Sequence, residues 1–291
     1  MIPLISLAVP KFDVIEDLSQ PPTLLRSKKR LITIHDIRRL EVSSSIIPRC
    51  AYLLSLWVCR WLGTHVITVS REMKKRISLH YPVGLIQVIE NSLPVAFAHD
   101  GDQSSNFALQ FDDYILAVGH LEARKNYINL IDAFLNLSRR WSKMGLVIVG
   151  KDNGEEQAIR RLVEKLNLLG RVKILASISD RELVELYRSA QLLVFPSLYE
   201  GFGIPLLEAM ATDCPLAVSD IDVFHEIAGD AALYFNPNDT SDICSTIDTL
   251  IESTELGEYL IRKGREELEK FQPSQIAKKI SELYTFETTA K

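Results

Sequence analysis

The chain has little cysteine, and its cysteines are scattered. Cys50, Cys59, Cys214 and Cys244 form no C-x-x-C pair, which argues against a disulfide framework and suits a reducing compartment. The six histidines also lack the spacing typical of metal ligands. We therefore expect neither a disulfide nor a tightly bound metal ion.

Long apolar runs are absent as well. Residues 51–59 are apolar, but Arg49 and Arg60 flank them, and the stretch is much shorter than the ~20 residues that span a bilayer. A buried or interfacial helix fits better. Trp57 and Trp61 lie one turn apart in it and suit either a protein core or lipid headgroups, and we expect the core.

Charge is nearly balanced, with a net value of -5, which argues against a general nucleic-acid binder. Residues 1–105 nevertheless hold 13 Lys and Arg against 9 Asp and Glu, a balance of +4, so the rest of the chain carries -9. The basic residues of this front part suit a solvated surface or an anionic membrane surface. They form two groups: Arg26, Lys28, Lys29, Arg30, Arg38 and Arg39, then Arg71, Lys74, Lys75 and Arg76. Because no secretory signal is evident at the start, we expect a cytoplasmic protein, with contact to the inner face of the membrane as an open alternative.

Short strand-like runs alternate with helix-like patterns, which predicts parallel sheets covered by helices, an α/β fold. We expect four strands in the front part and six behind it. They span Phe12–Ile15, Leu31–Ile34, Val66–Val69 and Ile86–Ile89, then Tyr114–Val118, Leu146–Val149, Val172–Leu175, Leu192–Phe195, Pro215–Val218 and Ala232–Phe235. The polar stretch at residues 98–106 is typical of a linker, so we predict one domain over residues 1–105 and another over residues 106–291.

The loop after residues 114–118 carries two adjacent cations, Arg124 and Lys125. Ligands of open α/β sheets bind beyond the carboxyl ends of the strands, and two such cations can offset most of the charge of a diphosphate without a metal ion. Taken alone, the pair would also fit an ordinary loop surface.

The loop after residues 192–195 carries Gly201, Phe202 and Gly203 directly before a predicted helix. Glycines allow backbone amides to approach a ligand, and the positive end of a helix favours an anion. Glu200 precedes these glycines and Glu208 lies one turn into the helix, so both carboxylates can line one cleft and accept hydrogen bonds from sugar hydroxyls.

Together these segments resemble retaining glycosyltransferases of the GT-B fold, which use nucleotide sugars and carry an E-x7-E motif, matched here by Glu200 and Glu208. The resemblance covers roughly residues 114–239 and includes GHLEARKN, LVIVGKDNGEE, VKILASISDREL, SLYEGFGIPLLEAMA and SDIDVFHEIAGDAALYFNPND. It implies a complete C-terminal Rossmann-like domain that binds the nucleotide sugar, and an incomplete N-terminal Rossmann-like domain on the acceptor side.

The resemblance also implies roles for individual residues. Arg124 and Lys125 would neutralise the diphosphate, and Glu200 would face the transferred sugar. The loop at residues 176–179 would border the base, although Ala176 stands where the family commonly has glycine. The implied catalytic set is Glu200, Arg124, Lys125 and His35, where His35 would reach the donor sugar from the front part. The implied binding set is Gly201, Phe202 and Gly203 through their amides, Glu208 on the ribose hydroxyls, and Gly119 and Ser177.

The front part resembles the second half of the family's N-terminal domain, through FDVIEDL, LITIHDIRRL, HVITVSREMKKRI and IQVIENSLP. Family members normally begin with a further strand and a glycine-rich loop, whereas about a dozen residues precede FDVIEDL here. A shortened parallel sheet would leave apolar surface uncovered. We therefore expect a partner chain, self-association or an impaired protein.

The resemblance implies transfer of a hexosyl unit, mannosyl-like or glucosyl-like, from a GDP- or UDP-linked sugar to a glycan or lipid-linked acceptor with retention, in polysaccharide biosynthesis. No tightly bound cofactor is expected. The alternative is a non-catalytic or truncated nucleotide-sugar-binding subunit that needs a partner to supply the missing half. An epimerase of the same fold fits less well, because no additional acid/base constellation is present. An oxidoreductase is disfavoured, because no G-x-G-x-x-G follows a strand in either half.

Overall fold

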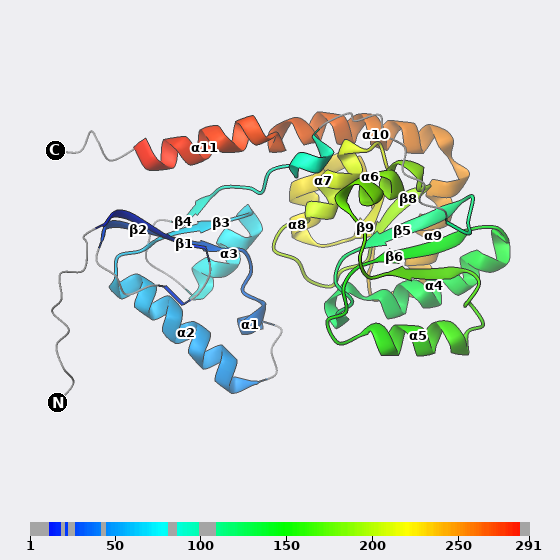
Figure 1. Ribbon diagram of the computed structural model, residues 1–291, viewed down its shortest axis with the longest axis horizontal. Coiled ribbons are helices and arrows are strands. Elements are labelled where there is room, and N and C mark those ends of the chain that lie inside the picture. Colours follow the sequence, from blue (N-terminus) through cyan, green and yellow to red (C-terminus); the bar gives the residue numbers. More distant parts are fainter. Residues whose placement is uncertain are drawn as a thin grey trace. The chain divides into compact units, whose positions relative to one another are not determined.

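The computed structural model describes residues 12–18, 21–22, 27–41, 45–80, 86–98 and 109–285. The chain divides into two compact units, residues 1–90 and 91–291 (Figure 1). This division falls ahead of the boundary predicted after residue 105. Leu93 and Phe97 belong to the second unit, because the amide of Leu93 donates to the carbonyl of Phe271 at 2.9 Å and the ring of Phe97 meets Tyr187 edge-on at 5.6 Å. The predicted linker lies almost wholly outside the described residues, as do Arg26 and the side chain of Lys28.

The first unit, unit 1, contains a parallel sheet of four strands in the order β1-β2-β3-β4. Leu31, Ile32 and Ile34 of β2 are buried, as expected for a strand between two neighbours with both faces covered. All four predicted strands are present, with shifted ends. The elements are β1 (Phe12–Asp17), β2 (Ser27–Ile34), α1 (Arg38–Glu41), α2 (Ile46–Trp61), β3 (His65–Thr68), α3 (Arg71–His80) and β4 (Ile86–Val88).

Helix α2 corrects one expectation about unit 1. Trp57 and Trp61 are 61% and 74% exposed, so they do not pack in the core. The reason is their position around the helix, because the side that α2 buries carries other residues. These are Tyr52, Ser55, Leu56 and Cys59.

Several basic residues of unit 1 are buried or paired with acids and so do not belong to a solvated basic surface. Lys29 and Arg30 are buried, and Arg30 forms an ion pair with Asp17 at 3.5 Å. In the second group, Arg76 pairs with Glu72 at 2.9 Å. Lys29 and Arg30 belong to the part of β2 that pairs with Val14 and Ile15 of β1.

The second unit, unit 2, contains a parallel sheet of six strands in the order β10-β9-β8-β5-β6-β7. The six predicted strands are confirmed, and four of them have the predicted ends. Strand β9 begins at Leu216, one residue later than predicted, because Pro215 has no N–H to donate to a neighbouring strand. The strands are β5 (Tyr114–Val118), β6 (Gly145–Val149), β7 (Val172–Leu175), β8 (Leu192–Phe195), β9 (Leu216–Ser219) and β10 (Ala232–Phe235).

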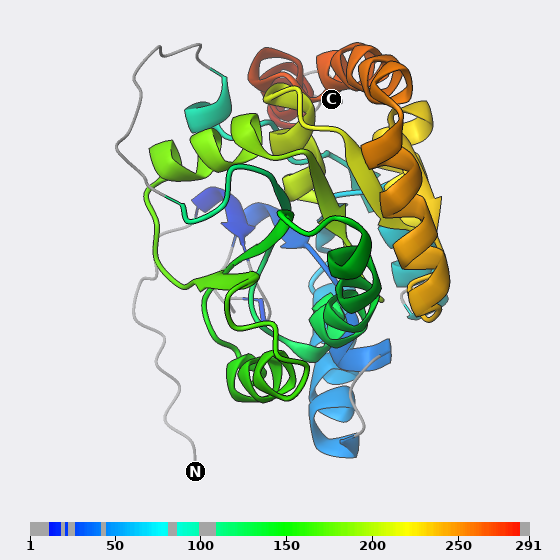
Figure 2. The same ribbon diagram turned by 90° about the vertical axis from the view of Figure 1, so that its right-hand side faces the viewer.

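Helices cover both faces of this sheet, with α4, α5 and α9 on one face and α6, α7 and α8 on the other (Figures 1 and 2). The core between sheet and helices includes Leu130, Phe134, Ile148 and Ile247, all fully buried. The helices are α4 (Tyr127–Arg140), α5 (Glu156–Lys165), α6 (Asp180–Ser189), α7 (Ile204–Ala211), α8 (Asp222–Ala228), α9 (Thr240–Glu252), α10 (Thr254–Leu268) and α11 (Pro273–Thr285). The described residues also form four short 3-10 helices, η1 (Val95–Phe97), η2 (Ala123–Lys125), η3 (Gly229–Ala231) and η4 (Glu269–Phe271).

Local signals in the sequence set several helix starts. Ser179 and Glu182 form a capping box at the start of α6, and Pro205 lies in the first turn of α7. In unit 1, the hydroxyl of Ser70 accepts from the amide of Met73 at 3.0 Å. Each bond satisfies a backbone amide that has no partner within its helix.

The strand order of unit 2 changes direction between β5 and β8. From β5 the chain adds β6 and β7 on one side, then returns to place β8 on the other side. The helices that follow β5 and β8, α4 and α7, therefore lie on opposite faces of the sheet, and the carboxyl edge between them is the usual ligand position in an open α/β sheet. The sequence places the two cations and the two glycines on these loops.

Candidate functional site

The loops after β5 and β8 are fastened to each other. The amide of Leu198 donates to the carbonyl of Arg124 at 2.8 Å. Within the first loop, Arg124 and Lys125 form η2, and the cap that follows is Asn126, in the left-handed conformation with φ 58°. A single backbone bond thus holds the cation pair against the segment that leads to the glycines.

One carboxylate gathers the charged groups of both loops. Glu200 Oε1 lies 2.5 Å from Arg124 Nη1 and 2.7 Å from Lys125 Nζ. The Ser197 hydroxyl donates to the same oxygen at 2.9 Å. Glu122 adds a second acid, with Oε1 2.6 Å from Arg124 Nη2. Two cations and two carboxylates are therefore balanced in a largely buried cluster.

Arg124 keeps one donor open in this cluster. Its Nη1 also donates to the carbonyl of Tyr199 at 3.0 Å. Its Nε is buried and has no hydrogen-bond partner among the described residues. A buried N–H without an acceptor is costly, so this atom is suited to an oxygen of a bound anion.

Lys125 is 5% exposed, with Nζ 4.3 Å from the centre of the Phe195 ring. Gly119 makes room for it. A Cβ on Gly119 would lie 2.8 Å from both Cε and Nζ of Lys125, and Gly119 has a φ of +143°, which side-chain-bearing residues rarely adopt. Burial lowers the pKa of Lys125, and the nearby Glu200 carboxylate opposes that change.

The predicted glycine loop leads into α7. Gly203 is the cap before the helix and has a φ of +143°. The side chain of Phe202 is buried and meets the Phe271 ring edge-on at 5.8 Å. The loop is thus anchored through the ring of Phe202. Ligand contact through the amides of Gly201, Phe202 and Gly203 stays a prediction.

Glu208 lies within α7 and is 8% exposed. Its Oε2 accepts a hydrogen bond from the hydroxyl of Tyr187 at 2.7 Å. Burial raises the pKa of Glu208, while the Tyr187 hydrogen bond and the charge of Lys125 act against that rise. The electrostatic influence of Lys125 links Glu208 to the cation cluster.

Tyr187→Phe is expected to make nucleotide binding more sensitive to acid. Glu208 is expected to accept hydrogen bonds from ribose hydroxyls, and a protonated carboxyl loses that acceptor capacity, so binding should weaken as the pH falls through the pKa of Glu208. The substitution removes a bond that lowers this pKa, so the weakening begins at a higher pH. Calorimetry with a nucleoside diphosphate between about pH 5 and about pH 8 measures the effect, which we expect to reach about fivefold in Kd. An unchanged pH profile would contradict it.

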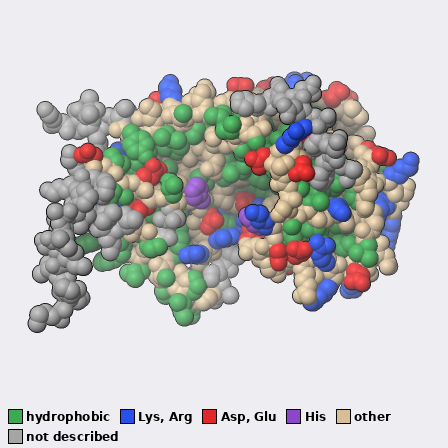
Figure 3. All heavy atoms as spheres, in the orientation of Figure 1, with side chains coloured by type: hydrophobic (Ala, Val, Ile, Leu, Met, Phe, Trp, Pro, Cys, Tyr) green, Lys and Arg blue, Asp and Glu red, His purple; other side chains and the backbone are tan. Residues whose placement is uncertain are grey.

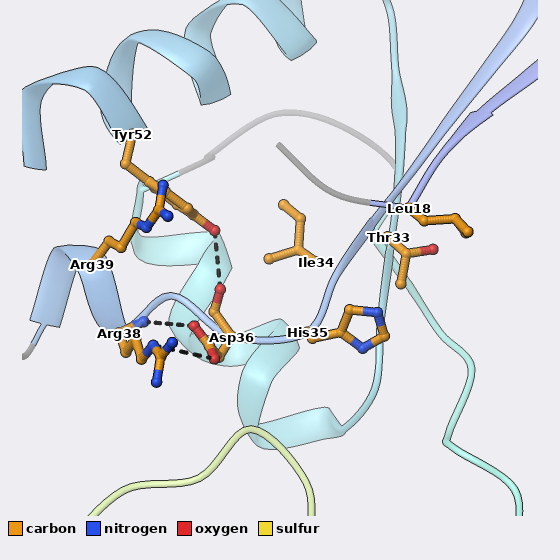
Figure 4. Close-up of a pocket in the computed structure, with 8 residues that line it drawn as sticks. All are labelled: Leu18, Thr33, Ile34, His35, Asp36, Arg38, Arg39 and Tyr52. Carbon is orange, nitrogen blue, oxygen red and sulfur yellow. Dashed lines mark hydrogen bonds and ion pairs between the residues drawn. The ribbon is translucent and has the colours of Figure 1, made fainter. Parts of the chain in front are cut away.

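The remaining expected site residues are Ser177 and His35. Ser177 is exposed in the loop between β7 and α6, and its expected place beside the base stays a prediction. His35 belongs to unit 1 and follows β2, where it lines a pocket of about 220 Å³ (Figure 4). In that pocket Asp36 accepts from the amide of Arg38 at 3.2 Å, and its carbonyl accepts from the Tyr52 hydroxyl at 3.0 Å. The role of His35 toward the donor sugar also stays a prediction.

Sequence reasoning missed four participants, Glu122, Ser197, Tyr127 and Tyr187. Tyr127 donates to the carbonyl of Gly119 at 2.9 Å and so holds the loop that accommodates Lys125. Glu122 is two residues from Arg124, and Ser197 is three residues from Glu200. Both contacts are therefore local in the sequence and could have been predicted from it. The contact between Tyr187 and Glu208 joins α6 to α7 and has no such signal.

Fold and site together define a GT-B-like α/β protein of the kind that binds a ligand at the switch in strand order. The chain belongs to the family described as Glycosyl transferases group 1, which matches residues 103–267. O-antigen chain mannosyltransferase RfbU of Salmonella typhimurium is 36% identical over 228 residues, which are 77% of this chain and 61% of that relative. O-antigen chain mannosyltransferase B of Escherichia coli is 32% identical over 167 residues, 57% of this chain and 44% of the relative. The chain thus spans less than two thirds of the length of these relatives.

Solved structures show the same fold. WaaG, a glycosyltransferase involved in lipopolysaccharide biosynthesis, matches with a TM-score of 0.76 at 16% identity, over 94% of this chain and 78% of that one. HepE of Anabaena, in complex with UDP and glucose, matches with a TM-score of 0.72 at 19% identity, over 89% and 72% of the two chains. In the part of the chain that the structure describes, no helix is long and apolar enough to span a bilayer.

Proposed function

We propose that this chain transfers a hexosyl unit from a nucleotide-diphosphate sugar to a glycan or lipid-linked acceptor, with retention of configuration. Family membership and the names of the relatives support a transferase, and those names favour a mannosyl over a glucosyl unit. Both GDP and UDP remain candidate carriers. A lipid-linked acceptor would bring the protein to a membrane surface.

The observation that carries this proposal is the buried cluster between two neighbouring loops of unit 2. Arg124 and Lys125 meet there on Glu200, and the Nε of Arg124 lacks a partner among the described residues. Planar guanidinium and compact ammonium groups are well suited to phosphate oxygens. The start of α7 at Gly203 adds the positive end of a helix.

The proposed chemistry uses this cluster at the leaving group. Negative charge develops on the diphosphate as its bond to the sugar breaks, and fixed cations and amides stabilise that charge with little reorganisation. Arg124, Lys125 and the amides of residues 201–203 would do so. The acceptor hydroxyl would attack on the face that the phosphate leaves, without a covalent intermediate, and Glu200 would face the transferred sugar.

Glu200 also affects donor binding, because its carboxylate already pairs with both cations. A diphosphate brings further negative charge into a balanced cluster and competes with Glu200 for the two cations. Glu200→Gln is therefore expected to tighten binding of the free nucleoside diphosphate severalfold, while transfer falls about tenfold or more. Calorimetry and steady-state kinetics separate the two effects. A parallel loss of both would show that Glu200 supports the phosphate site instead.

Thermal-shift measurements with UDP, GDP and ADP and their sugars test the proposal, because a ligand that binds the folded state raises the apparent stability. The nucleotide sugar that stabilises the chain is then incubated with the chain and with lipid-linked or free glycan acceptors. The anomeric configuration of the product is determined by NMR. Inversion would overturn the retaining assignment. If no nucleotide sugar stabilises the chain, the donor site itself is wrong.

The second candidate is a nucleotide-sugar-binding subunit without its own catalysis. The observation that favours it is that the contacts of the Glu200 cluster lie within unit 2, so the cluster accounts for donor binding whether or not transfer follows. Donor binding by calorimetry without transfer or hydrolysis would favour this candidate. Transfer by the isolated chain would exclude it.

A further inference from the structure

Helix α2 of unit 1 carries six large apolar side chains that are between 43% and 80% exposed. We call them the apolar stripe: Ile46, Ile47, Leu53, Leu54, Trp57 and Trp61. Soluble proteins rarely expose so many large apolar side chains on one short element, and such patches mark interaction sites. Figure 3 shows hydrophobic side chains gathered over α2, at the lower left.

The stripe occupies one side of the helix. Ile46, Leu53, Trp57 and Trp61 recur at multiples of three to four residues, so they lie on a common face. The opposite side is buried against unit 1 through Tyr52, Ser55, Leu56 and Cys59. The helix is therefore apolar on both sides, and packing within unit 1 accounts for only one of them.

The charges of α2 point to the chemistry of the occupant. Its 16 residues include no Asp or Glu, and its charged residues are Arg49 and Arg60. With 3.6 residues per turn, both arginines fall at the same flank of the stripe. The neighbouring α1 adds Arg38 and Arg39, which are exposed. Positive charge beside exposed tryptophans is the pattern of a helix that lies in the headgroup region of a membrane.

We propose that the apolar stripe of α2 docks on the surface of an anionic phospholipid membrane. The stripe enters the boundary between headgroups and acyl chains, and Arg49 and Arg60 contact lipid phosphates at its flank. Trp57 and Trp61 lie one turn apart and combine an apolar ring with an N–H that reaches the headgroups. At 16 residues, α2 lies along the surface and does not cross the bilayer.

Co-sedimentation of the full chain with vesicles tests the proposal without any assay of transfer. We expect binding to vesicles of phosphatidylglycerol and phosphatidylcholine, weaker binding to phosphatidylcholine alone, and a decline with added salt. Trp57→Ser combined with Trp61→Ser should lower the partition constant at least about tenfold. Because both side chains are exposed, circular dichroism and thermal unfolding of this variant should match those of the original chain.

A matched control replaces two exposed apolar residues of unit 2, Val95 and Leu169, each 68% exposed. Val95→Ser with Leu169→Ser should bind vesicles as the original chain does. Arg49→Gln with Arg60→Gln should weaken binding to anionic vesicles about fivefold or more and flatten the salt dependence.

Three results would overturn the proposal. The first is no sedimentation of the original chain with anionic vesicles, and the second is equal binding by the tryptophan variant and the control. The third is a dimer in sedimentation velocity that the tryptophan variant abolishes without any vesicle binding, which would assign the stripe to a second copy of the chain.

Discussion

Lys125→Met is expected to lower kcat/KM for the donor by about 10²-fold to 10³-fold. The ammonium group is almost fully buried and sits 2.7 Å from Glu200, where water screens its charge poorly. Methionine keeps most of the side-chain length beside the Phe195 ring but supplies no charge to the leaving diphosphate. Glu200 retains bonds to Arg124 and Ser197, so the substitution leaves no unpaired carboxylate and the fold should persist.

Steady-state kinetics with the nucleotide sugar that stabilises the chain measure this effect, and thermal unfolding checks the fold. Lys143→Met provides the matched control, because Lys143 is exposed just before β6, at the amino edge of the sheet. Its kinetics should be unchanged. Unaltered turnover in a folded Lys125→Met variant would remove Lys125 from the reaction.

Much of the fold followed from patterns that are local in the sequence. The buried strands of unit 2 are short runs rich in Val, Ile and Leu, and β5, β7, β8 and β10 have the predicted ends. The start of β2 was harder to predict, because lysine and arginine residues such as Lys29 and Arg30 usually lie on the surface. They belong to the strand since β1 pairs with them and Asp17 compensates the charge of Arg30.

The site was predictable as a set of residues and much less as a set of contacts. Position at the carboxyl ends of neighbouring strands indicated that Arg124, Lys125 and the glycine loop would meet. Pattern alone did not indicate that Glu200 would take up both cations, because its partners are 75 or more residues away in the chain. In the sequence, a carboxylate beside glycines fits equally well as an acceptor for sugar hydroxyls. Only the folded chain brings Glu200 to Arg124 and Lys125.

The sequence of α2 did not indicate which of its side chains are exposed. Apolar residues occupy nearly the whole surface of α2, so periodicity does not tell which side faces the sheet. Tyr52 settles the question in the structure, since its hydroxyl donates to the carbonyl of Asp36 and fixes that side inward. Trp57 and Trp61 are left outside.

Gly119→Ala is expected to reduce donor turnover about as strongly as loss of Lys125, by about 10²-fold. A methyl group at this position would lie 2.8 Å from Cε and Nζ of Lys125, so the end of the Lys125 side chain must shift and its ammonium group loses its present position beside Glu200. The φ of +143° adds backbone strain, which should lower the free energy of unfolding by about 1–3 kcal/mol. Gly170→Ala is the matched control, because an added methyl group there meets nothing within 4 Å.

A double-mutant cycle decides whether Gly119 acts through Lys125. Lys125→Ala removes the atoms that the new methyl group would strike, so adding Gly119→Ala to it should cost little further turnover. Coupled positions of this kind show strong non-additivity, whereas independent ones add. If the double variant is slower than Lys125→Ala by the full factor of the single glycine variant, Gly119 contributes to the reaction by a separate route, such as the contact of its carbonyl with Tyr127.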